Sequence, residues 1–170
     1  VWSGANTHLV FGTLAVTSTY IYHAGIRFQS LAIPAGATIT AATLTLNITS
    51  NTGAAVGKLY ADDVDDAAAW SAGNKPSGIT KTTATVDIDP TGTGVQGFNI
   101  LSVVQEVLGR GGWASGNDVR FGIFRNGAYN AQIESYEAVG TDEPQLDITY
   151  TTGGGGGGGT SGNLLLLGVG

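Results

Sequence analysis

The densest group of residues that could carry chemistry is the acidic segment ADDVDDAAAW. It places four aspartates within five positions: Asp62, Asp63, Asp65 and Asp66. Because Ca²⁺ prefers carboxylate oxygens, these aspartates are a weak candidate for a calcium site. Their spacing departs from the EF-hand loop, which needs a glycine at its sharp turn and a closing glutamate. An extended strand would also send alternate carboxylates to opposite faces, so the favoured interpretation is a solvated acidic strand end without metal.

Aromatic side chains form a second candidate group, since their rings could line a glycan-binding face. The residues that we single out for this role are Trp70, Tyr129 and Tyr136. Aromatic side chains of β-sandwiches pack in the core or along strand edges more often than they bind ligands. Packing is therefore the expected role, and glycan contact is the alternative.

The sequence assembles no recognisable catalytic machinery. His8 and His23 are the only histidines, and spacing identifies no Ser-His-Asp arrangement and no glycosidase carboxylate pair. The chain contains no cysteine, which excludes disulfides, thiolate chemistry and cysteine-type zinc sites. We therefore expect a protein that is not an enzyme and carries no cofactor, with calcium as the alternative.

Charge and hydropathy narrow the range of partners. The 170 residues carry 13 acidic and 7 basic side chains, a net charge of −6, and the basic ones are scattered. Neutralising the phosphates of nucleic acid needs clustered Lys and Arg, so we expect no nucleic-acid binding. No run approaches the roughly 18 apolar residues of a membrane span.

Charged residues make up 12% of the chain, against about 25% in average domains, and Thr, Ser, Ala and Gly replace them. This composition is typical of virion or otherwise extracellular surfaces.

Alternation of apolar and polar residues predicts strands along most of the chain. In ATLTLNITS, the apolar residues share one face of the strand: Ala42, Leu44, Leu46 and Ile48. We expect further short strands in IRFQSLAI, AVGKLYA, TATVDID, GVQGFNI, DVRFGIF, AQIESYEA and QLDITYT. In ILSVVQEVLGR the helical spacing predicts a helix over 101–108, with Ser102 as its N-cap and Gly111 ending it. These elements predict an all-β fold: a two-sheet antiparallel β-sandwich of jelly-roll type, with one short helix and an extended Gly-rich C-terminal tail.

The helix and the turn after it, VVQEVLGRGGWASGN, resemble a known family. Together with RFQSLAIPAGATITAATLTL before them and PQLDITY after them, they are similar to DNRLRE-type β-sandwich modules, which are related to carbohydrate-binding modules. The resemblance covers residues 20–151 and implies a carbohydrate-binding-module-like sandwich. Many family members carry an arginine shortly before the acidic Ser-containing strand, where this chain has Tyr129 and Asn130.

Trp113, in the turn GWASGN, is expected to have a structural role. A helix that leaves one end of a sandwich must be held where the chain turns into the next strand. A tryptophan offers the largest apolar area for this contact, and its indole N–H can bond a loop carbonyl. Gly111, Gly112 and Gly116 relieve the backbone of the turn. The alternative role for Trp113 is a platform on which a ligand stacks.

The C-terminal tail sets the domain organisation. We expect an N-terminal arm or first strand in 1–19, the sandwich in 20–152, a Gly-rich linker in 153–162 and an apolar anchor in 163–170. Seven successive glycines, 153–159, favour a flexible spacer. The anchor residues are Leu164, Leu165, Leu166, Leu167 and Val169. Exposed, they would promote aggregation, so we expect them buried on a neighbouring subunit or along an open sandwich edge, with an extended and paired backbone.

A spacer followed by an apolar anchor favours a non-catalytic structural protein of an extracellular assembly. By analogy, this is a tailed-phage virion protein, either a capsid decoration (cement) protein or a tail or fibre component. Its partners would be protein subunits of the same assembly, namely a major capsid protein, a tail protein or itself, with cell-surface glycan as a further partner. The alternatives are a carbohydrate-binding module of a secreted bacterial protein and a self-assembling surface filament subunit. The tail favours the structural protein over the carbohydrate-binding module, because a sugar-binding module needs a linker to its enzyme rather than a terminal leucine anchor.

Overall fold

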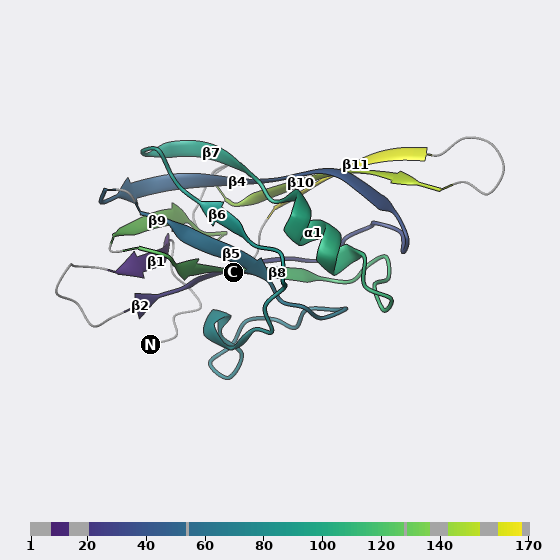
Figure 1. Cartoon of the computed structure of the whole chain (residues 1–170), viewed down its shortest axis with the longest axis horizontal. Helices are drawn as coiled ribbons and strands as arrows, with labels where there is room; N and C mark the ends of the chain where they lie inside the picture. Colours follow the sequence, from purple (N-terminus) through teal and green to yellow (C-terminus); the bar gives the residue numbers. More distant parts are fainter. Residues whose placement is uncertain are drawn as a thin grey trace.

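The computed structural model describes residues 8–13, 21–53, 55–127, 129–136, 143–153 and 160–167. These residues form two antiparallel β-sheets that pack face to face, with one α-helix beside them (Figure 1). The predicted all-β, two-sheet sandwich with one short helix is confirmed. No helix within these ranges is long and apolar enough to cross a membrane.

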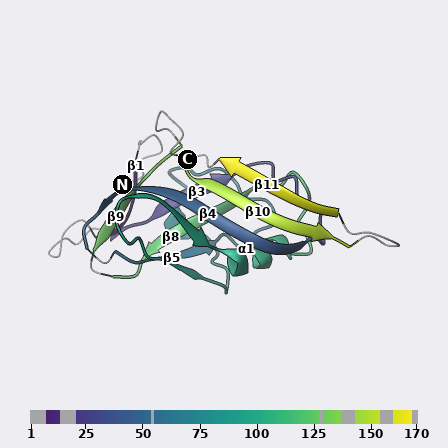
Figure 2. The same cartoon turned by 90° about the horizontal axis from the view of Figure 1, so that it is seen from above.

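The large sheet has seven strands in the described part of the chain. Its order is β11-β10-β4-β9-β1-β2, and β7 pairs with the other edge of β4. The bounds of these strands are β1 His8–Thr13, β2 Ile21–Tyr22, β4 Thr38–Asn51, β7 Gly94–Asn99, β9 Asn130–Glu134, β10 Gln145–Thr152 and β11 Thr160–Leu167. Figure 2 shows β4, β10 and β11 side by side, as their registers require.

Within the described residues, the small sheet has four strands in the order β3-β8-β5-β6. Their bounds are β3 Ala24–Phe28, β5 Gly57–Ala61, β6 Val86–Ile88 and β8 Val119–Arg125. A segment of 24 residues, 62–85, leaves β5 and returns to β6 across the outer face of this sheet (Figure 1). We call it the covering segment; it contains the 3₁₀ helix η1, Pro76–Gly78.

The core lies between the two sheets, and the alternation in β4 builds one side of it. Its predicted inward residues Ala42, Leu44, Leu46 and Ile48 are all buried, which confirms the expected face. The other sheet contributes Phe28 and Phe121, whose rings meet edge to face with centroids 6.0 Å apart. Burial of side chains of this size supplies the main stabilisation of such a domain.

Helix α1, Leu101–Leu108, lies against β4 of the large sheet and β5 of the small sheet (Figure 1). The predicted range is confirmed, but the predicted cap is wrong. Ser102 lies inside the first turn, and Ile100 is the N-cap residue and makes no side-chain capping bond. Instead the Leu101 N–H donates to Asn99 Oδ1 at 3.0 Å. Because Ile100 is buried in the core, the helix begins at Leu101, two residues earlier than a Ser102 cap would place it.

The predicted ends of the helix and of one strand differ from the structure. The helix closes at Gly109 rather than Gly111, since the Gly109 N–H donates to the Gln105 carbonyl at 2.9 Å. The strand expected to run through IRFQSLAI ends at Phe28, because Ser30 has a left-handed φ of 53°. Asp118 Oδ1 accepts the Ser30 N–H at 2.7 Å, and this bond stabilises the backbone at the point where the strand ends.

Candidate functional site

The acidic segment begins the covering segment, and its first aspartate is buried. Asp62 is 2% exposed and forms an ion pair with Arg120 of β8. Arg120 Nε donates to Asp62 Oδ2 at 2.7 Å, and the Thr80 N–H donates to Asp62 Oδ1 at 2.9 Å. The expectation of a solvated acidic strand end is therefore wrong for Asp62. Arg120 supplies the countercharge that a buried carboxylate needs.

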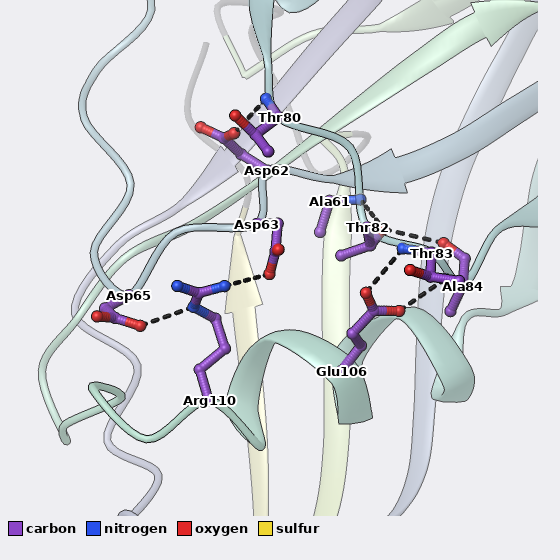
Figure 3. Close-up of polar contacts among 10 residues, drawn as sticks. All are labelled: Ala61, Asp62, Asp63, Asp65, Thr80, Thr82, Thr83, Ala84, Glu106 and Arg110. Carbon is purple, nitrogen blue, oxygen red and sulfur yellow. Dashed lines mark hydrogen bonds and ion pairs between the residues drawn. The ribbon is translucent and has the colours of Figure 1, made fainter.

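The next aspartates pair with the arginine that follows helix α1. Arg110 Nε donates to Asp65 Oδ1 at 2.6 Å, and the same guanidinium pairs with Asp63 (Figure 3). The hydrogen bonds that Arg110 donates to Asp65 and then to Asp63 raise the pKa of Arg110 above its usual value. Asp66 Oδ1 accepts the Asp118 N–H at 2.9 Å. These bonds tie the start of the covering segment to the end of the helix and to β8.

The four aspartates that suggested calcium do not come together as one ligand set. Asp62 faces Arg120, Asp63 and Asp65 face Arg110, and Asp66 accepts a backbone N–H. In the part of the chain that the structure describes, no three His, Cys, Asp or Glu side chains are placed to hold a metal ion.

Helix α1 also holds the far end of the covering segment. Glu106 accepts the backbone N–H groups of Thr83 at 2.7 Å and Ala84 at 2.6 Å (Figure 3). Glu106 lies in helix α1 and Arg110 follows its end, so the helix and the turn after it hold both ends of the segment. Sequence reasoning missed this pair. Its only signal is a Glu in the single predicted helix and an Arg four residues later, just after that helix.

Trp70 lies in the middle of the covering segment and fills a depression over the small sheet. Gly25 of β3 pairs with Gly122 of β8, so two adjacent positions of the outer face lack side chains. A Cβ built at Gly25 would lie 2.6 Å from Pro76 Cγ and 2.9 Å from Trp70 Cε2. Trp70 is 8% exposed, and the Arg120 guanidinium lies 4.5 Å from its ring centroid. The ring is thus covered by protein and does not form an open face for a sugar.

The other two aromatic candidates are exposed but lie apart. Tyr129 and Tyr136, which are 43% and 48% exposed, flank opposite ends of β9 in the large sheet. Trp70 covers the small sheet, so the three candidates do not share a face. The ring of Tyr129 rests on Gly53, where a built Cβ would lie 3.0 Å from the ring carbon Cδ1.

Trp113 is buried in the main core, as expected. It is 3% exposed and belongs to the same buried cluster as the apolar residues of helix α1. Its indole Nε1–H donates to the Ile33 carbonyl at 3.0 Å. The backbone N–H of Trp113 also donates to the Arg110 carbonyl at 3.1 Å. The turn GWASGN therefore joins the helix to the loop before β4.

The leucine run forms strand β11, which pairs antiparallel with β10 over eight residues. The register sets Leu164 opposite Ile148 and Leu166 opposite Leu146, two residues that point into the core. The expected extended and paired backbone is confirmed for these leucines, and the strand that they pair with belongs to their own chain. The register also sets Gly162 opposite Tyr150, and a Cβ built at Gly162 would lie 2.5 Å from that ring. Val169, the last anchor residue, lies outside the described residues.

Comparison with known proteins gives no family for this chain. It matches no protein-family model, and a search of curated proteins gives no match. The resemblance to DNRLRE-type modules therefore stays a prediction from the sequence.

Proposed function

We propose that this chain is a non-catalytic structural subunit of an extracellular assembly, joined to its neighbours through β11. The observation that carries the proposal is the position of four successive leucines on an edge strand of the large sheet. The described residues offer no comparable feature at the acidic segment, where salt bridges and backbone hydrogen bonds engage the carboxylates.

The argument follows from the geometry of a strand. Successive residues of a strand point to opposite faces, so a run of four apolar residues cannot lie on one face. The register sets Leu164 and Leu166 opposite Ile148 and Leu146, whose side chains are buried in the core. It sets Leu165 and Leu167 opposite Asp147 and Gln145, which lie on the outer face of the sheet. Continuous apolar runs are typical of strands that are buried on both faces.

The free energy of burying apolar side chains favours a partner on the outer face of the large sheet. Covering two leucine side chains is worth about 3 to 6 kcal/mol, at roughly 1.5 to 3 kcal/mol each. This gain is available to a neighbouring subunit and not to the sandwich core, which lies on the opposite side of the sheet. A virion fits such a partner, since its subunits repeat at high local density. Within that class we propose a tailed-phage protein, a capsid decoration protein or a tail or fibre component, by analogy alone.

The test compares the whole chain with two matched variants. In one, Leu165→Lys places a charge on the outer face of β11. In the other, Thr45→Lys places the same charge on the outer face of the central strand β4, away from that edge. Each protein is checked for folding by circular dichroism and mixed with particles or filaments of its source that lack it. We expect the wild type and Thr45→Lys to co-sediment with the particles, and Leu165→Lys to remain in the supernatant. Equal incorporation of all three would remove the proposal.

Glycan binding is the second candidate, and one observation favours it. Tyr129 rests on Gly53 with nearly half of its side chain exposed, which suits stacking against a sugar ring. Titration calorimetry against cell-surface polysaccharides, with Tyr129→Ala as the variant and Tyr136→Ala as its control, tests this role. Binding that is lost only in Tyr129→Ala would support it, and the absence of binding to the wild type would reject it.

A further inference from the structure

Strand β11 differs from the other edge strands of the sandwich. It is eight residues long, and its sequence TSGNLLLL contains neither a charge nor a proline. Proteins usually protect exposed edges with short strands, charged side chains, prolines or bulges, because a free edge can pair with another chain. β11 has none of these protections along its length.

The remaining edge strands of the described sheets are all shorter than β11, and two of them carry a charged residue. β2 has two residues, and β6 has three, of which Asp87 pairs with Lys58. β3 carries Arg27, which pairs with Asp118. β7 has six residues, two of them glycines, which weaken a strand. Among the described edges, β11 is therefore the longest, and unlike β3 and β6 it carries no charged residue.

We infer that the strand that β11 accepts is β11 of a second copy of this chain, paired antiparallel about a two-fold axis. This inference rests on the proposed function and names the partner. An antiparallel pair of identical strands is self-complementary, so a single edge serves both subunits. Pairing through β11 would join the two large sheets into one continuous sheet. Leu165 and Leu167 of each copy would then lie near those of the other on the shared outer face.

Charge favours this edge for contact between copies. Each chain carries a net charge of −6, so two copies repel one another over most of their surfaces. β11 has no charged residue, and two copies can meet there without opposing like charges. A strongly basic partner strand would find no carboxylate on β11 to pair with. A second copy, which is equally neutral at this edge, has no such mismatch.

The pairing is expected to be weak for an isolated pair, because one strand edge buries less surface than a standard interface of about 1,600 Å². Many such contacts in one assembly add up through avidity. Sedimentation velocity of the whole chain up to a concentration of about 1 mM covers the range in which a weak dimer forms. We expect the average mass to rise from monomer towards dimer with concentration.

Two variants and one mapping experiment test the geometry. Leu165→Lys is expected to weaken the dimer at least about tenfold, since like charges would face each other across the new strand pair. Thr45→Lys, on the outer face of the same sheet but on a central strand, is expected to dimerise as the wild type does. Hydrogen exchange of the wild type should show β11 amides becoming more protected as concentration rises, with no change in β7, which is another edge strand of the same sheet.

The outcomes separate this inference from the proposed function. A wild type that stays monomeric over the whole range, or a dimer that protects amides elsewhere, overturns the inference. If Leu165→Lys does not fold, the exchange map of the wild type decides alone. A monomer that still needs Leu165 to join particles would refute self-pairing and keep the structural role. A β11 dimer that joins no particle would support self-pairing and refute the proposed place in an assembly.

Discussion

Arg120 and Asp62 form a buried ion pair that fixes the covering segment to the small sheet. The two residues lie side by side where β8 passes the end of β5, and the Asp62 N–H donates to the Arg120 carbonyl at 3.0 Å. They are 6% and 2% exposed, so water screens neither charge. The Arg120 guanidinium also lies against Trp70, which joins the ion pair to the aromatic side chain above it. Loss of either charge would leave the other buried without its countercharge.

We predict that Asp62→Asn destabilises the protein by about 3 to 5 kcal/mol, the usual cost of breaking a buried pair from one side. Urea unfolding followed by tryptophan fluorescence measures the change. The control is Asp63→Asn, whose side chain is 33% exposed. Because exposed pairs contribute little, the control should cost about 1 kcal/mol or less. Equal effects at both positions would show that the Asp62 pair is not buried in solution.

We predict that Trp113→Ala lowers the free energy of unfolding by about 3 to 5 kcal/mol, as large-to-small changes in a core do. The indole both fills the core beside helix α1 and donates to Ile33. Trp113→Phe keeps most of the apolar area and loses the hydrogen bond, so its cost should be clearly smaller. Thermal and urea melts give both values. A change below about 1 kcal/mol for the alanine variant, as at exposed sites, would revive a ligand role for this residue.

Acid is predicted to destabilise the protein through His23. Burial, and then the charge of Lys81, lower the pKa of this histidine below its usual 6.5. Its ring lies 4.7 Å from that of Phe124, and Lys81 Nζ lies 3.7 Å from the centroid of the same phenyl ring. The unfolded chain therefore binds a proton more readily than the folded chain. Stability is complete above pH 6.5, falls as the pH drops below that value, and levels off below the folded pKa.

His23→Gln provides the control for this pH dependence. The variant removes the titrating group, so the difference between wild type and variant should be constant above pH 6.5 and change only below it. Urea unfolding at several pH values from about 8 to about 5 measures the difference over the usual range of histidine titration. A constant difference at all pH values would show that His23 titrates normally in the fold.

Gly25→Ala is predicted to destabilise the covering segment by about 1 to 3 kcal/mol, the usual cost of overpacking. The new methyl group would meet Pro76 and Trp70, which occupy the space above Gly25. Gly73→Ala is the matched control, because it lies in the same segment and a Cβ there meets nothing within 4 Å. Tryptophan fluorescence and urea melts follow both variants. A tolerated Gly25→Ala would mean that Trp70 does not seat over β3.

Local patterns predicted the parts of this fold that depend on neighbours in the sequence. The alternation from Ala42 to Ile48 identified a strand and its buried face, because one side of a sheet must be apolar when the other faces water. Trp113 could be predicted as buried because helix, turn and strand follow one another directly.

Long-range partners could not be predicted in the same way. Asp62 and Arg120 are 58 positions apart, and nothing in either local sequence shows that sheet pairing brings them together. The acidic segment therefore suggested a metal or a solvated end. Ser102 shows a different limit: two residues suited to capping, Asn99 and Ser102, flank the start of the helix. Asn99 accepts the first helical N–H because Ile100 is buried in the core, and only the tertiary structure reveals that burial.

One turn of the covering segment is a site where the fold should tolerate inserted sequence. Its ends are held by Glu106 and Arg110, and Trp70 holds its middle. Between Trp70 and η1, Ser71 and Asn74 close a tight turn through reciprocal backbone hydrogen bonds of 3.2 and 3.0 Å. The residues at its tip are exposed, and no anchor of the segment lies among them. Exposed turn tips of this kind accept added chain most readily. An epitope or affinity tag placed after Gly73 would thus be displayed on the side of the sandwich away from the large sheet, leaving both the core and β11 untouched.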